Sequence, residues 1–160
     1  MPYTLKVEGM DGIVETLAKA GEAAQGIAAR ALYRGAGIVA DEISKGAREV
    51  TTSRFKYAKG WQRQPSPEEK AAIVSAGVGI AKFRKTGNEV NTSVGYGRSG
   101  YADVNGKQKP VALIANSINS GTSFMKKQPF IRKAASQSKQ KASDAIADEI
   151  QALVIKELNE

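Results

Sequence analysis

Residues 22–50 read EAAQGIAARALYRGAGIVADEISKGAREV, and this stretch predicts the first long element of the fold. Its apolar residues recur at steps of three and four, a spacing that places side chains on one face of a helix. The members of this stripe are Ala28, Leu32, Ala36, Val39, Ile43, Ala47 and Val50. The pattern therefore predicts a long amphipathic helix over residues 22–49.

Three glycines, Gly35, Gly37 and Gly46, lie inside this predicted helix. Each costs about 1 kcal/mol relative to alanine in a helix interior. Close approach of another backbone is the usual reason for keeping such residues, so we expect a close neighbour at these positions. Upstream, Asp11 has the side chain of an N-cap and predicts an earlier helix, which Gly21 would break or kink.

A second long helix is predicted to begin at Pro129. Proline suits the first helical position because its fixed φ is already helical and it needs no N–H partner there. About 30 residues at a rise of 1.5 Å give a length of about 45 Å, more than a small sheet can cover. We therefore expect this helix to contact another helix or another subunit. Its apolar stripe consists of Ile131, Ala135, Ala142, Ile146, Ile150, Val154 and Leu158.

The residues between the two helices predict shorter elements. Ser66, Pro67 and Glu69 form a capping-box sequence at the start of a short helix that ends before Gly77. Residues 80–84 and 89–96 are expected to be strands joined by a turn at 85–88. A second short helix is expected to follow Pro110 and to end at Gly121.

Residues 51–65 and 97–109 are expected to be flexible loops, the second with a tight turn at Asn105-Gly106. The whole chain, residues 1–160, is therefore expected to be a single α+β domain. Two long helices would pack on a small antiparallel sheet, and the basic loop at 51–65 would be the variable part.

The composition excludes several kinds of chemistry. The chain has no Cys and no His, which removes disulfides, Cys nucleophiles and His-based catalysis, together with nearly all zinc, haem and iron–sulfur sites. Neighbouring acidic pairs lie on predicted helix faces, where solvation is the ordinary state. We therefore expect no enzymatic activity and no cofactor. No apolar run approaches the roughly 18 residues of a membrane span, and the first residues show no basic segment followed by an apolar stretch, so neither a secretory signal nor membrane contact is expected.

The net charge of +8 is concentrated in the middle of the chain, where residues 50–133 carry 15 basic and 4 acidic residues. Such a cationic stretch indicates a polyanionic neighbour, either nucleic acid or an acidic protein surface, unless it serves solubility alone. The candidate interface or DNA-channel residues are Arg54, Lys56, Lys59, Trp61 and Arg63 in the aromatic-rich segment and Lys82, Arg84 and Lys85 in the predicted hairpin.

Several segments in sequence order resemble a known family. They are VEGMDG at 7–12, IAKFR at 80–84 with VGY at 94–96, LIANSINSGTS at 113–123 and QPFIRKA at 128–134. Their order and spacing resemble the tail-completion or head–tail joining proteins (neck or minor tail proteins) of long-tailed bacteriophages, in the version found in phages of Gram-positive hosts. The motif residues Gly121, Thr122, Pro129 and Phe130 are interpreted as structural. Gly121 suits a left-handed helix cap, Thr122 or Ser123 can bond to nearby backbone, and Phe130 can anchor the last helix on the sheet.

The resemblance implies a virion structural protein assembled in the host cytoplasm. Its subunits would form a homo-oligomeric ring of about six at the head-proximal end of the tail, joined to other neck and tail proteins. Phage DNA would pass through the channel and contact it transiently. Two alternatives stay open at this point. One is a sequence-independent nucleic-acid-binding protein that uses the 54–63 segment, and the other is the tail terminator ring itself.

Overall fold

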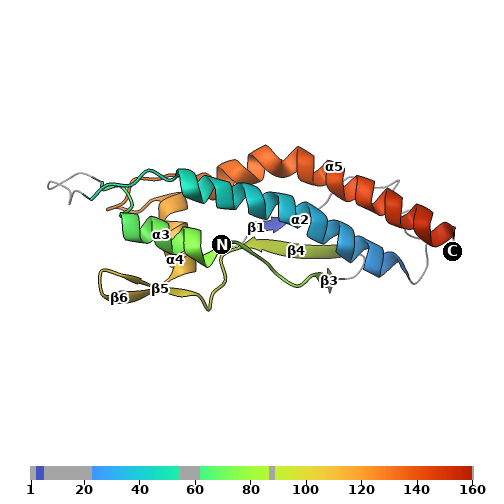
Figure 1. Cartoon of the computed structure of the whole chain (residues 1–160), viewed down its shortest axis with the longest axis horizontal. Helices are drawn as coiled ribbons and strands as arrows, with labels where there is room; N and C mark the ends of the chain where they lie inside the picture. The colour runs from blue at the N-terminus through green and yellow to red at the C-terminus, as the bar shows by residue number, and fades with distance from the viewer. Residues whose placement is uncertain (1–2, 6–22, 55–61, 87–88, 160) are drawn as a thin grey trace.

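The computed structural model describes residues 3–5, 23–54, 62–86 and 89–159 (Figure 1). In chain order the elements are β1 (Tyr3–Leu5), α2 (Ala24–Glu49), α3 (Pro67–Ala76), β2 (Gly79–Ile80), β3 (Arg84–Thr86), β4 (Glu89–Gly95), β5 (Tyr101–Val104), β6 (Lys107–Pro110), α4 (Val111–Ser120) and α5 (Phe130–Leu158). The long helices α2 and α5 combine with small antiparallel sheets, which confirms the predicted α+β class.

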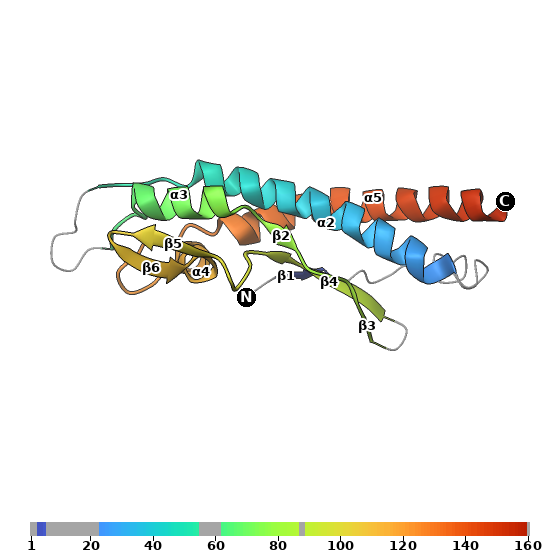
Figure 2. The ribbon, with the colours of Figure 1, turned by 60° about the horizontal axis from the view of Figure 1, so that its bottom comes forward.

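The two long helices run side by side in opposite directions along the long axis of the molecule (Figures 1 and 2). Two glycines of α2, Gly35 and Gly46, lie against α5. A Cβ added at Gly35 would lie 2.5 Å from Cγ1 and Cδ1 of Ile146, and one added at Gly46 would lie 3.4 Å from Cβ of Phe130. The predicted close approach of a backbone is confirmed at Gly35, where the added Cβ would also lie 3.2 Å from the Ala142 carbonyl oxygen. At Gly46 the contact is an ordinary van der Waals contact. The prediction is wrong at Gly37, because nothing lies within 4 Å of a Cβ there.

The main sheet is centred on β4. Strand β1 pairs with one side of β4, and β2 and β3 pair with it from the other side, all antiparallel. The predicted strand at 80–84 is therefore divided in two, with residues 81–83 between its parts. The reason is that this segment bonds partly to side chains: the Thr92 hydroxyl donates to the Ala81 carbonyl (2.7 Å), and the Phe83 N–H donates to the Tyr33 hydroxyl (3.1 Å).

The turn between β3 and β4 is shorter than predicted. Lys85 and Thr86 belong to β3, where they pair with Val90 and Glu89. Only residues 87–88 connect the two strands, and these lie outside the described residues. The helix predicted after Asp11, the break at Gly21 and the side chain of Leu158 lie outside them as well.

Residues 97–109 are not the loop that the sequence predicted. Strands β5 and β6 form a two-stranded hairpin in this region. The predicted tight turn is confirmed, since Asn105 and Gly106 have φ values of 56° and 76° and the Gly106 N–H donates to Asp103 Oδ1 (2.8 Å). A turn of this kind sets the register of the flanking strands even where their composition is polar.

The short helices begin and end close to the predicted residues. Ser66 and Glu69 form both bonds of the capping box of α3, which ends at Gly77. Helix α4 ends at Gly121, whose φ of 75° is in the left-handed region that glycine tolerates. The sequence predicted Pro129 as the first helical residue of α5. In the structure Pro129 is the N-cap, and the helix begins one residue later at Phe130.

Candidate assembly surfaces

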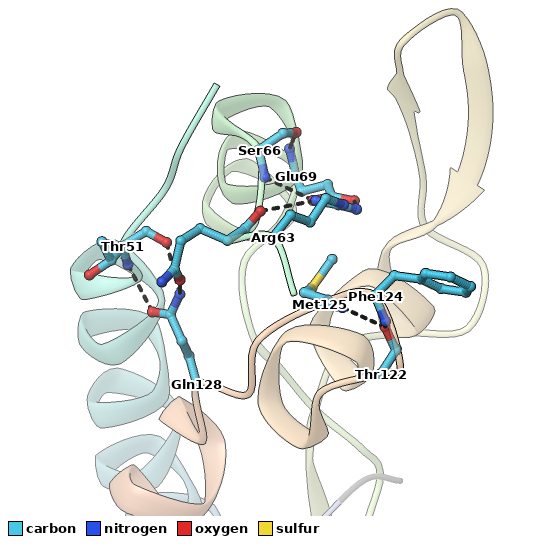
Figure 3. A network of polar contacts seen from close by, with 9 residues as sticks. Thr51, Arg63, Ser66, Glu69, Thr122, Phe124, Met125 and Gln128 are labelled. Carbon is cyan, nitrogen blue, oxygen red and sulfur yellow. Dashed lines mark hydrogen bonds and ion pairs between the residues drawn. The ribbon is translucent and has the colours of Figure 1, made fainter. Parts of the chain in front are cut away.

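The two ends of the basic segment 51–65 are held together by the side-chain amide of Gln128. Its Nε2 donates to the carbonyl of Thr51 (2.8 Å) and to Oε1 of Gln64 (2.8 Å), while its Oε1 accepts the N–H of Thr51 (2.9 Å). Figure 3 shows the amide between the two chain segments. The N–H of Ser53 adds a bond to the carbonyl of Pro65 (3.1 Å). The base of the segment is therefore closed and fixed to the start of α5.

Arg63 forms a two-pronged ion pair with Glu69 of α3. Each terminal guanidinium nitrogen lies 2.7 Å from one carboxylate oxygen, and Glu69 is only 4% exposed. Burial raises the pKa of the Glu69 carboxyl, but hydrogen bonds from the Arg63 guanidinium and the Ser66 backbone N–H lower it by more, so the net pKa lies below its ordinary value. The charge of Arg63, a predicted interface cation, is thus engaged inside the chain.

The backbone around Arg63 is joined to the segment that connects α4 to α5. The Arg63 N–H donates to the carbonyl of Phe124 (2.9 Å), and the Lys126 N–H donates to the carbonyl of Arg63 (2.9 Å). Gln62 Nε2 donates to the carbonyl of Thr122 (2.8 Å). We call the contacts that join residues 51–53 and 62–66 to residues 122–128 the junction. It unites two sets of residues that the sequence had treated separately.

The structural motif residues lie at the junction or directly beside it. The Thr122 hydroxyl accepts the N–H groups of Phe124 (3.2 Å) and Met125 (3.0 Å), as predicted for this residue (Figure 3). A Cβ on Gly121 would lie 3.0 Å from Cβ of Lys127, so this glycine is required by space as well as by its φ. Sequence reasoning missed Asn119, whose Oδ1 accepts the N–H of Ile131 (3.1 Å) at the start of α5. An amide side chain carries no periodic signal that would have revealed it.

Phe130 anchors α5 to the end of the main sheet. Its ring meets that of Tyr96, the residue after β4, edge to face with centroids 6.5 Å apart. The Tyr96 hydroxyl is buried without a hydrogen-bond partner among the described residues. Burial raises the pKa of Tyr96 to about 12.

The structure places the other predicted cations in two separate regions. Arg54 is exposed beside the junction, whereas Lys56, Lys59 and Trp61 lie outside the described residues. The hairpin cations Lys82, Arg84 and Lys85 are all exposed, and they accompany an aromatic pair that the sequence did not predict. In that pair Tyr33 of α2 meets Phe83 edge to face, with centroids 6.3 Å apart. Figure 2 shows α3 near one end of the molecule and β3 toward the other, so the fold does not merge the two regions.

Two open grooves run between the C-terminal part of α2 and the N-terminal part of α5. One has a volume of about 320 Å³ and contains Glu42, Glu49, Lys127 and Lys133 in its lining. The other, of about 390 Å³, is lined by Asp41, Glu42, Lys45 and Lys141 among others. Charges of both signs alternate in each groove, so neither selects a cationic or an anionic ligand. Within the described ranges, no three Asp, Glu, His or Cys side chains are placed to hold a metal ion.

Comparisons of the chain with protein-family models, with curated proteins and with solved structures yield no match. Among the helices in the described part of the chain, none has both the length and the apolarity needed to cross a membrane.

Proposed function

We propose that this chain is a structural subunit of the head–tail junction of a long-tailed bacteriophage. In this proposal its subunits form a homo-oligomeric ring that completes the tail, joins it to the neck and lets DNA pass through its channel. It has no catalytic role and no cofactor. The observation that carries the proposal is the junction, in which Thr122 and Gln128, two residues of the stretches that resemble the family, hold the base of the basic segment.

The contacts of the junction support this role in a specific way. The stretches 113–123 and 128–134 carry the resemblance. Within them, Thr122 and Gln128 bond to residues 51, 62 and 64, which are distant in sequence. Such contacts hold the base of the basic segment in one orientation relative to the long helices. A subunit that must meet identical neighbours needs its contact segments oriented in this manner before assembly.

The charge beside the junction suits weak, sequence-independent contact with DNA. There Arg54 is exposed, whereas Arg63 is paired with Glu69. A channel that DNA must traverse requires phosphate contacts that are few and exchangeable. Strong binding to many phosphates would oppose movement and would be steeply dependent on salt.

Light scattering on the purified full chain, combined with negative-stain imaging of the same sample, tests the proposal. We expect a ring of about six subunits with a central hole. A monomer at every protein concentration would count against a ring that forms without the tail. Tight binding of duplex DNA by that monomer, lost as salt is raised, would replace the proposal with the nucleic-acid-binding alternative. Imaging of the ring within a particle distinguishes tail completion from tail termination.

A further inference from the structure

One exposed surface combines aromatic side chains with unpaired cations, and we call it the aromatic–basic face. It lies along the exposed edge formed by Tyr33 and residues 80–85, which carries Ile80, Phe83, Lys82, Arg84 and Lys85. Arg84 and Lys85 are consecutive in β3, so their side chains leave opposite sides of this edge strand. Tyr33 is 37% exposed and Phe83 is 40% exposed, although the two rings contact one another. In the described part of the chain none of the three cations forms an ion pair. The face therefore offers both apolar area and positive charge to a partner.

A second exposed surface has the opposite charge, and we call it the acidic face. It lies on the C-terminal half of α5 and consists of Asp144, Asp148, Gln151 and Ile155, whose spacing places them on one side of the helix. Ile155 is 52% exposed, although it is a large apolar residue. The opposite side of α5 is buried against α2 through Ile146, Ile150 and Val154. The acidic face thus points away from α2.

The two faces lie at opposite edges of the helix pair and at the same level along it. Gly35 abuts Ile146, and the helices run antiparallel, so Tyr33 is level with about residue 148. Two residues along a helix correspond to a rotation of about 200°, so Tyr33 lies on the side of α2 that is turned away from α5. The order across the molecule is therefore aromatic–basic face, α2, α5, acidic face.

We propose that the acidic face of one copy docks on the aromatic–basic face of the next copy. This inference rests on the proposed ring function and names the surfaces that close the ring. A contact between two different faces of identical subunits is heterologous, and it generates a ring when the rotation between copies closes. In this arrangement Asp144 and Asp148, which are near the level of Tyr33, meet the hairpin cations beside the Tyr33–Phe83 pair.

The two faces have opposite charges and lie at the same level along the helix pair. These properties favour a second copy over nucleic acid as the partner of the aromatic–basic face. A nucleic acid would satisfy the cations and the rings, as in other strand-binding surfaces. It would leave Ile155 exposed on the acidic face. A second copy would cover that face. The two charged residues of the acidic face, Asp144 and Asp148, are both negative, so this surface repels phosphate.

Cross-linking tests the contact directly, because the chain has no cysteine. Two single-cysteine variants are made, Thr86→Cys beside the aromatic–basic face and Gln151→Cys on the acidic face, and both are treated with a short bismaleimide. We expect the equimolar mixture to give about tenfold more cross-linked dimer than either variant alone. The matched control is a mixture of Gln108→Cys, on exposed β6, with Gln151→Cys. A yield from the test mixture no higher than from this control would overturn the proposal.

Charge reversal gives a second, independent test by light scattering at low salt. The Lys82→Glu/Lys85→Glu variant has two acidic faces, and the Asp144→Lys/Asp148→Lys variant has two basic faces. We expect neither to assemble alone and the mixture to recover the assembly of the unaltered protein, with circular dichroism as a check that each variant is folded. Rings that persist in both variants would overturn this contact but leave the proposed ring function standing.

The Lys82→Glu/Lys85→Glu variant also shows whether the aromatic–basic face binds nucleic acid instead of a second copy. Duplex DNA binding is measured by fluorescence anisotropy for the unaltered chain and for Lys82→Glu/Lys85→Glu. A large loss of DNA affinity, with no excess of cross-linking in the cysteine mixture, would overturn the proposal and assign the aromatic–basic face to nucleic acid. Failure of the proposed function itself is recognised separately, by the absence of a ring from the unaltered chain.

Discussion

Glu69 is the residue on which the fixed end of the basic segment depends. Its carboxylate is almost fully buried and accepts bonds from the Arg63 guanidinium and the Ser66 N–H. Removing one member of such a pair leaves the other charge poorly solvated, which is why the loss exceeds that of a surface ion pair.

We expect Glu69→Gln to lower the free energy of unfolding by about 2 kcal/mol, because it removes a charge-assisted pair of bonds to Arg63. Urea unfolding followed by circular dichroism measures the change. The matched control is Glu68→Gln, which alters an exposed neighbour that makes no ion pair with Arg63. Its loss should be smaller, because the hydrogen bonds that lower the pKa of Glu68, at the backbone and with Ser66, are exposed to solvent. Equal losses in the two variants would show that the pair itself contributes nothing.

The lowered pKa of the Glu69 carboxyl also predicts how the free energy of unfolding depends on pH. The pKa of Glu69 is lower in the folded chain than its ordinary value, so its stabilisation is complete above the unfolded pKa of about 4.3. That stabilisation is lost as the pH falls through the lower folded value. We expect the Glu69→Gln variant to lose less stability than the unaltered protein between pH 5 and pH 3 in parallel urea titrations.

Tyr96 carries a buried hydroxyl without a partner, which is an energetic cost in the folded state. We expect Tyr96→Phe to leave the ring contact with Phe130 intact and to raise the free energy of unfolding by about 1 kcal/mol. Tyr101→Phe is the control, since Tyr101 is 62% exposed. A clear loss of stability in Tyr96→Phe would mean that the hydroxyl is bonded in solution.

Burial of Tyr96 also predicts a loss of stability in alkali. The folded pKa is raised from 10.0 to about 12, so the unfolded chain releases this proton first. The stabilisation of the neutral hydroxyl is complete below pH 10 and is lost as the pH rises toward 12. We expect the decline in stability above pH 10 to be shallower in Tyr96→Phe than in the unaltered protein.

At the scale of elements, two glycines of α2 distinguish the effect of helix propensity on stability from the effect of packing. Gly35 and Gly37 are two residues apart in one helix, yet only Gly35 lies against α5. We expect Gly35→Ala to destabilise the protein by about 2 kcal/mol through overlap with Ile146. Gly37→Ala should stabilise it by about 1 kcal/mol, the gain in helix propensity.

Thermal unfolding measures both glycine changes. The combination of Gly35→Ala with Ile146→Val tests the cause, because a smaller side chain on α5 should recover part of the loss. Two stabilising substitutions would mean that α2 and α5 are less closely packed than the Gly35–Ile146 contact indicates.

The junction depends on one side-chain amide that bonds to two segments. We expect Gln128→Ala to lower the free energy of unfolding by about 2 kcal/mol, because it leaves the Thr51 N–H and Gln64 amide without their partner. Native-state hydrogen exchange should show faster exchange at the Thr51 amide. Gln137→Ala, an exposed change on α5, serves as the control and should leave that amide protected.

At the scale of the whole molecule, an interface built on opposite charges should weaken as salt is added. Screening lengths fall from about 10 Å at 0.1 M to about 3 Å at 1 M salt. We expect the mass measured by light scattering to fall as salt is raised over this range. A mass that is independent of salt would point to an interface that is mainly apolar and lies elsewhere.

Predictability from the sequence differed sharply between elements. The long helices, the capping box of α3 and the turn at Asn105-Gly106 depend on neighbours within a few residues, and their patterns predicted them. The division of the strand at 80–84 was not predicted, because it depends on Thr92 and Tyr33, which are close only after folding. For the same reason Arg63 was interpreted as an interface cation, although Glu69 engages it.

By itself, the sequence determined the α+β class, the two amphipathic helices and the concentration of positive charge in residues 50–133. These properties follow from local periodicity and composition, which depend only on residues that are close together in the sequence. Only the tertiary structure decided which cations are exposed, which glycines meet α5, and that Gln128 closes the base of the basic segment. Each of these depends on contacts between residues far apart in sequence, whose distances are set when the helices pack and which no local pattern encodes.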